Sequence, residues 1–286
     1  MVFLLRVKIL VFSFSTIGIL VIVGCNNTTV MTMTTVKEKV VLYMAGSGTF
    51  VIDWGNGLEI ETHSLSEYKE NDWNNYHKYY EFIYHYPYTS YHSITITGEN
   101  ITHLRCGINK LTSLDVSKNS ALKYLWCSDN QLENLDISKN TALNVLYCGN
   151  NQFTSLNTSR NSVLIELDCS HNQLTSLDVR RNTMLTDFIC RYNQIASLDL
   201  SKNPALLLLL CTNNQLTSLD LSKNTALELL ICNNNQLTIS VLNTLFNTLN
   251  SNAELKTIVI NGNPGENDCD RSIATNKGWE FRDFSD

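Results

Sequence analysis

Two consecutive stretches of the chain decide its fold. Residues 143–163 read LNVLYCGNNQFTSLNTSRNSV, and residues 164–184 read LIELDCSHNQLTSLDVRRNTM. Leu, Cys and Asn stand at matching places in both, and the Cys and Asn recur every 21 residues for seven turns. The recurring cysteines are Cys106, Cys127, Cys148, Cys169, Cys190, Cys211 and Cys232, and the recurring asparagines are Asn109, Asn130, Asn151, Asn172, Asn193, Asn214 and Asn235.

This spacing predicts how each turn is built. The Leu-x-Cys stretch alternates between inward and outward residues, as a short strand does. Because one turn cannot bury its apolar side alone, consecutive turns should stack with neighbouring strands about 4.8 Å apart. The Asn amide can donate and accept, so it is expected to satisfy backbone groups where the chain leaves the strand. A Cys at one fixed place in every turn is a packing position rather than half of a disulfide.

The motif L-x-x-L-x-C-x-x-N-x-F-x-x-L, from Leu143 to Leu156, resembles the leucine-rich repeat with Cys in place of one Leu. With the LDLSKNTAL segment at residues 219–227, the turns are similar to repeats of the internalin J type over about residues 101–265. The resemblance implies an α/β, mostly β, right-handed curved solenoid with a parallel sheet on its concave side. In internalins such solenoids adhere to host surfaces, although the ligand does not transfer with the motif.

The two ends do not repeat. Residues 36–99 contain the turn DWGNG at 53–57, with its Asn-Gly hairpin signal, and later an alternating run at 93–97. They resemble the PKD domain, an immunoglobulin-like β-sandwich, which implies a cap on the first turn. The repeats are assigned to residues 100–238, and residues 239–286 are expected to form a small α/β cap whose helix has Ser240 at its N-cap.

Residues 1–24 have the features of an export signal. Arg6 and Lys8 precede an apolar run at 9–23, which is too short to span a membrane. The sequence IVGC at 22–25 resembles the lipobox of bacterial lipoproteins, which implies that Cys25 is lipidated. Residues 25–35 are then expected to be a tether. We expect a lipid-anchored protein of the bacterial cell envelope, at the outer membrane, with the periplasmic and the outer face both open.

Charge argues against several partners. The net charge of −6 makes the chain a poor candidate for binding nucleic acid. A row of acids occurs at Asp115, Asp136, Asp178, Asp199 and Asp220, with a basic residue three positions after each. We interpret these rows as turn caps and solvated charge rather than as phosphate or calcium sites. No cofactor is implied, and His77, His85 and His92 do not have a zinc-site spacing.

The outward strand residues change along the repeats, with aromatics first, acids in the middle and aliphatics last. Solenoids usually bind on their concave sheet, and Trp, Tyr and Arg dominate interfaces. Strand propensity favours some of the same residues, so it stays a second explanation. We predict a protein partner, or a ligand on a host or neighbouring cell, and no catalysis. The predicted binding residues are Arg105, Tyr124, Trp126, Tyr147, Glu166, Asp168, Asp187, Ile189, Arg191, Leu208, Leu210 and Ile231.

Two other functions compete with this hypothesis. The Tyr- and Trp-rich insert at residues 62–82, with Trp73, could stack against sugars and capture a glycan. Glu166, Asp168 and Asp187 could act as the paired carboxylates of a glycoside hydrolase. An open sheet, however, lacks the pocket that tunes a catalytic carboxyl. The sequence does not identify the ligand, the side of the membrane or the oligomeric state.

Overall fold

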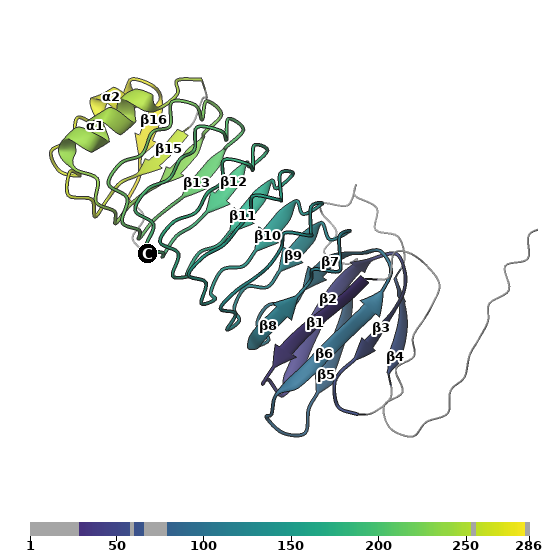
Figure 1. Ribbon diagram of the computed structural model, residues 1–286. Helices are drawn as coiled ribbons and strands as arrows, with labels where there is room; N and C mark the ends of the chain where they lie inside the picture. Colours follow the sequence, from purple (N-terminus) through teal and green to yellow (C-terminus); the bar gives the residue numbers. More distant parts are fainter. Residues whose placement is uncertain (1–28, 58–59, 66–78, 253–255, 284–286) are drawn as a thin grey trace, which may run out of the picture.

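The computed structural model describes residues 29–57, 60–65, 79–252 and 256–283. It shows an elongated body in which a two-sheet N-terminal part continues into a stack of coils, closed at the far end by two helices (Figure 1). The two helices are α1 and α2. Within the described ranges, neither has the length and apolar composition needed to cross a membrane.

The N-terminal part packs two β-sheets against each other. One sheet has the order β4-β3-β6-β1-β8, and β2 and β5 pair in the other. Alternating residues of these strands, such as Met31, Leu42, Phe50 and Ile96, are buried between the sheets. This arrangement matches the expected sandwich, whereas the likeness to PKD domains stays a prediction. The strands are β1 (Thr29–Thr35), β2 (Lys39–Gly46), β3 (Gly48–Asp53), β4 (Glu61–Leu65), β5 (Tyr80–His85) and β6 (His92–Gly98).

The coils each contribute a short strand to one parallel sheet, in which neighbouring strands pair without a shift of register. In every three-residue strand the middle residue is buried and the outer two are half-buried. The predicted alternation is therefore confirmed. The strands of this sheet are β7 (Ile101–Arg105), β9 (Tyr124–Trp126), β10 (Val145–Tyr147), β11 (Glu166–Asp168), β12 (Asp187–Ile189), β13 (Leu208–Leu210) and β14 (Leu229–Ile231). Strand β8 (Leu111–Asp115), between β7 and β9 in the chain, belongs to the other sheet.

Both sheets of the sandwich run on into the solenoid. Strand β7 pairs with β2 in the long sheet, and β8, on the opposite side of the first coil, pairs with β1. The side chain of Asn109 joins the two parts, because its amide donates to Val41 O at 2.7 Å and its Oδ1 accepts from Val41 N at 3.0 Å. The sandwich is thus a built-in end of the coil stack.

The predicted tether is wrong for residues 29–35. These residues form β1, which lies between β6 and β8 and buries Met31 and Met33. The sequence TVMTMTT has the period-2 alternation of a half-buried strand, which the polar threonines obscured. Residues 25–28 of the expected tether, with Cys25 and the export signal, lie outside the described residues.

The C-terminal cap adds two further strands to the long sheet and covers the last coil with helices. The elements are α1 (Ile239–Thr248), β15 (Lys256–Val259), α2 (Ser272–Thr275) and β16 (Trp279–Phe281). Thr238, not Ser240, stands at the N-cap of α1, and it makes no side-chain capping bond. The Lys277 ammonium donates to the carbonyls of Phe246, Asn247 and Leu249, so it satisfies and neutralises the C-terminal end of α1.

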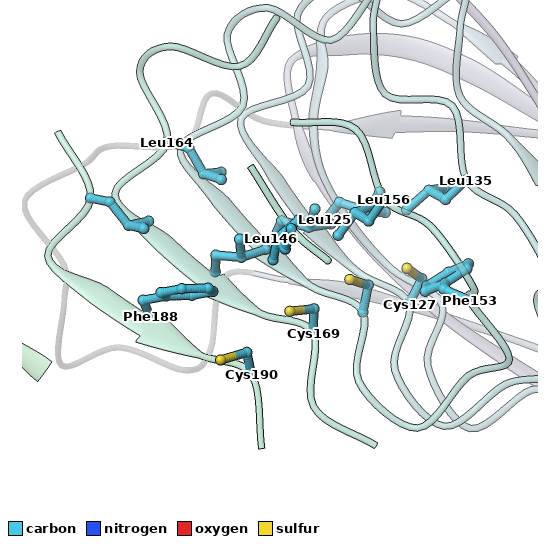
Figure 2. Packing of buried hydrophobic residues seen from close by; sticks show 14 of the residues in the cluster. Leu125, Cys127, Leu135, Leu146, Phe153, Leu156, Leu164, Cys169, Phe188 and Cys190 are labelled. Atoms are coloured by element: carbon cyan, nitrogen blue, oxygen red, sulfur yellow. The ribbon is translucent and has the colours of Figure 1, made fainter. Parts of the chain in front are cut away.

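The cysteine row lies in the core of the stack, beside the leucines and phenylalanines of successive coils (Figure 2). All seven thiols are free and fully buried. Burial raises the pKa of Cys127 and of Cys232 to about 12, so these sulfurs stay protonated and unreactive at neutral pH. The prediction that the row is core packing is confirmed.

Two rows of asparagine hold the coils together. The first asparagine ladder, Asn109 to Asn235, follows the cysteines as predicted. Asn172 is typical: its Oδ1 accepts from Phe153 N at 3.0 Å, and its amide donates to Cys148 O, Cys169 O and Ser170 O. A second asparagine ladder, on the opposite side of the coils, was not predicted. It comprises Asn119, Asn140, Asn161, Asn182, Asn203 and Asn224, all completely or almost completely buried.

Candidate binding surface on the strand sheet

The outward residues of β7 and β9–β14 form one continuous surface, which we call the strand face. The strands of the coils lie side by side along the stack (Figure 1). Their register aligns the outward residues in two rows across the sheet. The central row is Arg105, Trp126, Tyr147, Asp168, Ile189, Leu210 and Ile231. The parallel row is His103, Tyr124, Val145, Glu166, Asp187, Leu208 and Leu229. Eleven of the twelve predicted binding residues fall on these rows, and Arg191 lies just beyond β12.

The first part of the strand face is an aromatic cluster around Arg105. The Arg105 guanidinium lies 4.2 Å from the Trp126 ring centre and 5.3 Å from that of Tyr79. A Cβ at Gly107 would come 3.1 Å from Cε2 of Trp126, so the glycine leaves room for the indole. Cation–π contact on one side and close backbone on the other therefore hold Trp126 in place.

The rings beside this pair form a continuous chain. Tyr124 lies 5.8 Å from His103 in a stacked arrangement and 5.8 Å from Tyr147 in an edge-on one, both favourable for aromatic pairs. Tyr79 contacts both His103 and Tyr124. Because each ring has neighbours on the sheet, little side-chain entropy remains to be lost when a partner covers the cluster.

Sequence reasoning missed two members of the cluster, Tyr43 and Tyr79. Tyr43 comes from β2 of the sandwich, directly beside Arg105 in the sheet. Its hydroxyl donates to Glu81 of β5 at 2.7 Å, and this hydrogen bond is the largest cause that raises the Tyr43 pKa. The aromatic cluster therefore extends from the strand face into the N-terminal sheets, and only the pairing of β2 with β7 could have revealed that.

The middle of the strand face is an acidic group formed by Glu166, Asp168 and Asp187. Glu166 and Asp187 are direct lateral neighbours in the sheet. Each acid has a neutral donor: the Tyr147 hydroxyl for Glu166, the Ser170 amide for Asp168 at 2.9 Å, and Thr186 for Asp187 at 2.6 Å. Among the described residues, no ion pair involves any of the three.

Tyr147 links the acidic group to the aromatic cluster. Burial, followed by the hydrogen bond to Glu166, raises the pKa of the Tyr147 hydroxyl well above its usual range. The phenol therefore stays protonated and continues to donate. This bond fixes the orientation of the ring and of the carboxylate, so both groups are presented to a partner in one defined geometry.

The last part of the strand face is an aliphatic patch. Its members are the half-buried side chains of β12, β13 and β14, which lie next to one another in the two rows: Ile189, Leu208, Leu210, Leu229 and Ile231. Aliphatic side chains that adjoin on a sheet and are only half-buried form an apolar surface of the kind that another molecule covers.

The opposite side of the coils is polar and regular. Asp115, Asp136, Asp178, Asp199 and Asp220 each accept a hydrogen bond from the backbone N–H two residues later, and Asn157 does so where the row of acids is interrupted. The interpretation of these acids as turn caps is therefore confirmed. Within the described ranges, no cluster of three or more His, Cys, Asp or Glu side chains could hold a metal ion.

Comparison with known proteins agrees with this architecture. A family model for leucine-rich repeats in two copies matches residues 120–161. The functional domain of InlJ from Listeria monocytogenes, which includes a cysteine ladder, is 36% identical with a TM-score of 0.54, over 62% of this chain and 38% of that chain.

The fold is a leucine-rich-repeat solenoid with a cysteine ladder. An internalin, inlF of Listeria monocytogenes, matches at 29% identity and a TM-score of 0.42, over 45% of this chain and 40% of that chain. The chain thus spans well under two thirds of either structure. No curated protein matches the sequence. Leucine-rich-repeat solenoids of the internalin type are interaction modules, and protein–protein interaction is the activity that this fold suggests.

Proposed function

We propose that the chain is an exported, lipid-anchored protein of the bacterial cell envelope that binds a protein partner, or a host or neighbouring cell, through the strand face. The main support is the aromatic cluster around Arg105. It combines the residue types that carry most binding energy at interfaces, and its rings are held in place before any partner arrives. The resemblance to internalin solenoids favours adhesion over catalysis.

The proposal is tested on the half-buried indole of Trp126. A labelled protein of residues 26–286, which lacks Cys25, is titrated onto intact epithelial and bacterial cells, and bound label is measured by flow cytometry. We expect saturable, protease-sensitive binding that Trp126→Ala weakens at least about tenfold, because a central aromatic contact contributes about 2 kcal/mol or more. Tyr91→Ala, at an exposed tyrosine outside the strand face, serves as the matched control and should bind normally.

Equal binding by the Trp126→Ala and Tyr91→Ala proteins would refute the assignment to the strand face. Circular dichroism and a thermal melt show whether both variants keep the native fold. The indole is only half-buried, and its removal leaves Leu125, the core leucine of β9, untouched. Loss of binding therefore reports on the surface and not on folding.

Lipid anchoring is a separate part of the proposal and concerns Cys25, which lies outside the described residues. In a bacterial host, the wild-type chain should incorporate radiolabelled palmitate and sediment with the membrane fraction. Cys25→Ala should abolish the label and release the protein. Unchanged labelling in the variant would contradict this role for Cys25. Protease treatment of intact cells then decides between the periplasmic and the outer face.

Glycan capture is the alternative function, and two exposed aromatics support it. Tyr88 is 65% exposed and Tyr91 is 74% exposed, close in sequence to the Tyr-rich insert. Tyr84 and Tyr86, in contrast, pack inside: Tyr84 stacks on Trp54, and Tyr86 is buried with its hydroxyl on Trp54 O. A glycan array decides this alternative, because saturable sugar binding that Trp73→Ala abolishes would favour it. Trp73 itself lies outside the described residues.

A further inference from the structure

The central row orders three kinds of chemistry along one straight line. Arg105 and Trp126 come first, Asp168 lies three strands after Arg105, and Leu210 lies two strands further on. With about 4.8 Å between strands, the guanidinium and the carboxylate stand about 14 Å apart, and the leucine lies about 10 Å beyond. The row therefore distinguishes a ligand by the order of its groups as well as by their kind.

Arg105 presents an unneutralised cation at the start of the row. Aromatic faces surround its guanidinium, and no ion pair of the described residues involves it. Its Nε is buried without a hydrogen-bond partner. Glu81, the nearest acid along the row, lies two strands away and is bound by the Tyr43 hydroxyl. The outer edge of the guanidinium is thus left to pair with a carboxylate, which it can bind through two parallel hydrogen bonds.

The acidic group presents the opposite charge. Glu166 and Asp187 are side by side, an arrangement that costs free energy through like-charge repulsion, and their donors are uncharged. Arg191 lies two residues beyond the strand that contains Asp187 and makes no ion pair with these acids in the described residues. A cationic group from a partner would relieve the repulsion and would be attracted before contact.

The aliphatic patch completes the pattern. It adjoins the acids directly, since Asp168 is the register neighbour of Ile189, and Ile189 is the neighbour of Leu210. A ligand that places a cation over the acids therefore has apolar surface within one or two strand spacings. Covering that surface removes apolar area from water, and this contributes roughly 25 cal/mol per Å².

Resting on the proposed function, we propose that the strand face binds an extended polypeptide segment that runs across the strands, with an acidic residue over Arg105, a basic residue over Asp168 and an aliphatic residue over Leu210. An extended segment advances about 3.3 Å per residue, so the basic residue follows the acidic one by about four residues. The aliphatic one follows by a further two or four, the even numbers on either side of the roughly three residues that span 10 Å. Those spacings keep all three side chains on one side of the segment, because alternate residues of an extended chain share a face.

The inference is tested by peptide selection on the full chain. A phage-displayed library of random peptides about 16 residues long is panned against the immobilised protein, with the Trp126→Ala protein used for subtraction; this length exceeds the seven-strand row at 3.3 Å per residue. The expected result is enrichment of peptides with an acidic, a basic and an aliphatic residue at about these spacings, in either chain direction.

Charge variants then test the positions. For the best synthetic peptide, binding is measured by fluorescence anisotropy. Arg105→Gln and Asp168→Asn should each weaken it about tenfold or more, since a hydrogen bond to a charged group contributes about 1.5–3 kcal/mol. Replacing the peptide's acidic residue should weaken its binding to the Arg105→Gln protein only slightly further, but should weaken its binding to the Asp168→Asn protein about tenfold. Replacing the peptide's basic residue should have the opposite pattern.

The outcomes separate this inference from the proposed function. Peptides that depend on Trp126 but are indifferent to Arg105 and Asp168, or that carry no charge order, would overturn the ordered pattern and leave the strand face as a binding surface. Failure to enrich any Trp126-dependent peptide would count against both. Enrichment of acidic peptides alone would restrict the site to the aromatic cluster and also contradict the inference.

Discussion

The two asparagine ladders perform the same task with different completeness. In the first, Asn172 uses both ends of its amide, since Oδ1 accepts from the preceding coil and Nδ2 donates to three carbonyls. In the second, Asn161 donates to Ile137 O at 3.1 Å and Asn140 O at 2.9 Å, while its buried Oδ1 accepts nothing. A side-chain amide can thus join coils with its full hydrogen-bonding capacity or with about half of it. In the second case the bare oxygen is taken out of water without a hydrogen bond in return, which costs free energy.

A single exception shows how the deficit is removed. Thr158 occupies a coil position where the other coils have an aliphatic residue, and its hydroxyl donates to Oδ1 of Asn182 at 2.8 Å. The aliphatic residues are Val116, Ile137, Val179, Leu200 and Leu221. Asn182 is accordingly the one member of the second ladder whose Oδ1 has a partner among the described residues. The comparison teaches that residue identity and burial alone do not determine how much a buried amide contributes to stability. The contribution also depends on whether the amide oxygen accepts a hydrogen bond.

The largest effect is expected for Asn172→Ala. It leaves the Phe153 N–H without an acceptor in the core and removes one donor from each of three carbonyls, which keep their second donors. The free energy of unfolding should fall by about 3 kcal/mol. Urea denaturation followed by circular dichroism measures the change. A loss smaller than that of an equivalent second-ladder variant would reverse the ranking of the two ladders.

Asn161→Ala is expected to lower the free energy of unfolding less, by about 1–2 kcal/mol, although Asn161 is more completely buried than Asn172. Two carbonyls lose a donor, but the bare Oδ1 is removed at the same time. The same denaturation experiment measures it, and the two variants are matched in chemistry, secondary structure and distance from the chain ends. Equal losses would mean that the acceptor makes no difference.

Thr158→Val isolates the acceptor itself. The change keeps the shape of the side chain and leaves Oδ1 of Asn182 bare, so we expect a loss of about 1 kcal/mol or less. The reciprocal variant Val179→Thr places a hydroxyl at the equivalent position of the next coil, 24 residues before Asn203, whose Oδ1 has no partner among the described residues. This variant should lower the free energy of unfolding less than other buried Val→Thr changes do. An equally large decrease would show that a threonine at this position does not generally supply the missing donor.

The smallest effect is a dependence on pH confined to the side of the second ladder. Hydrogen bonds from the residue two positions later lower the pKa of Asp115, Asp136, Asp178 and Asp199, and that of Asp178 falls to about 2. Because the folded pKa lies below the unfolded value of about 3.9, this stabilisation is complete above about pH 4 and is lost as the pH falls through about 2. The wild-type melting temperature should therefore fall over this range.

Replacing these four acids with Asn should flatten that acid dependence with little change at neutral pH, because Asn157 already caps the equivalent turn in one coil at 3.0 Å. The acids are exposed, so the difference should be small and should diminish with salt. Thermal melts at several pH values measure it. If the protein with four Asn substitutions lost stability in acid as much as the wild type, the acid dependence would have to come from groups other than these aspartates.

The sequence was sufficient to predict what the period determines. The place of Cys148 in the core, the role of Asn172 and the outward direction of Trp126 follow from a 21-residue spacing combined with strand alternation. These features are local, because each is repeated by the neighbouring coil. The second ladder was equally periodic at Asn161, yet it lay inside a polar segment that looked like solvent-facing turn, so its burial was not recognised.

The features that the sequence did not reveal are long-range pairings. Tyr43 adjoins the strand face only because β2 pairs with β7, more than fifty residues away in the chain. No regular spacing in the sequence predicts such a contact. Strand β1 was assigned to a tether for a related reason, since its partners β6 and β8 lie far along the sequence. The residues of the binding surface could be named from alternation, but their grouping around Arg105 required the packed side chains.

Strand β1 has a mechanical consequence. It is hydrogen-bonded to β6 along all seven of its residues and to β8 along its second half, and the described chain enters it at Thr29. A pull on that end directed along the strand loads the bonds on both sides in shear, so many must break together rather than one after another. A body held by its N-terminal end would transmit tension through β1 into the sandwich at β6 and into the first coil at β8.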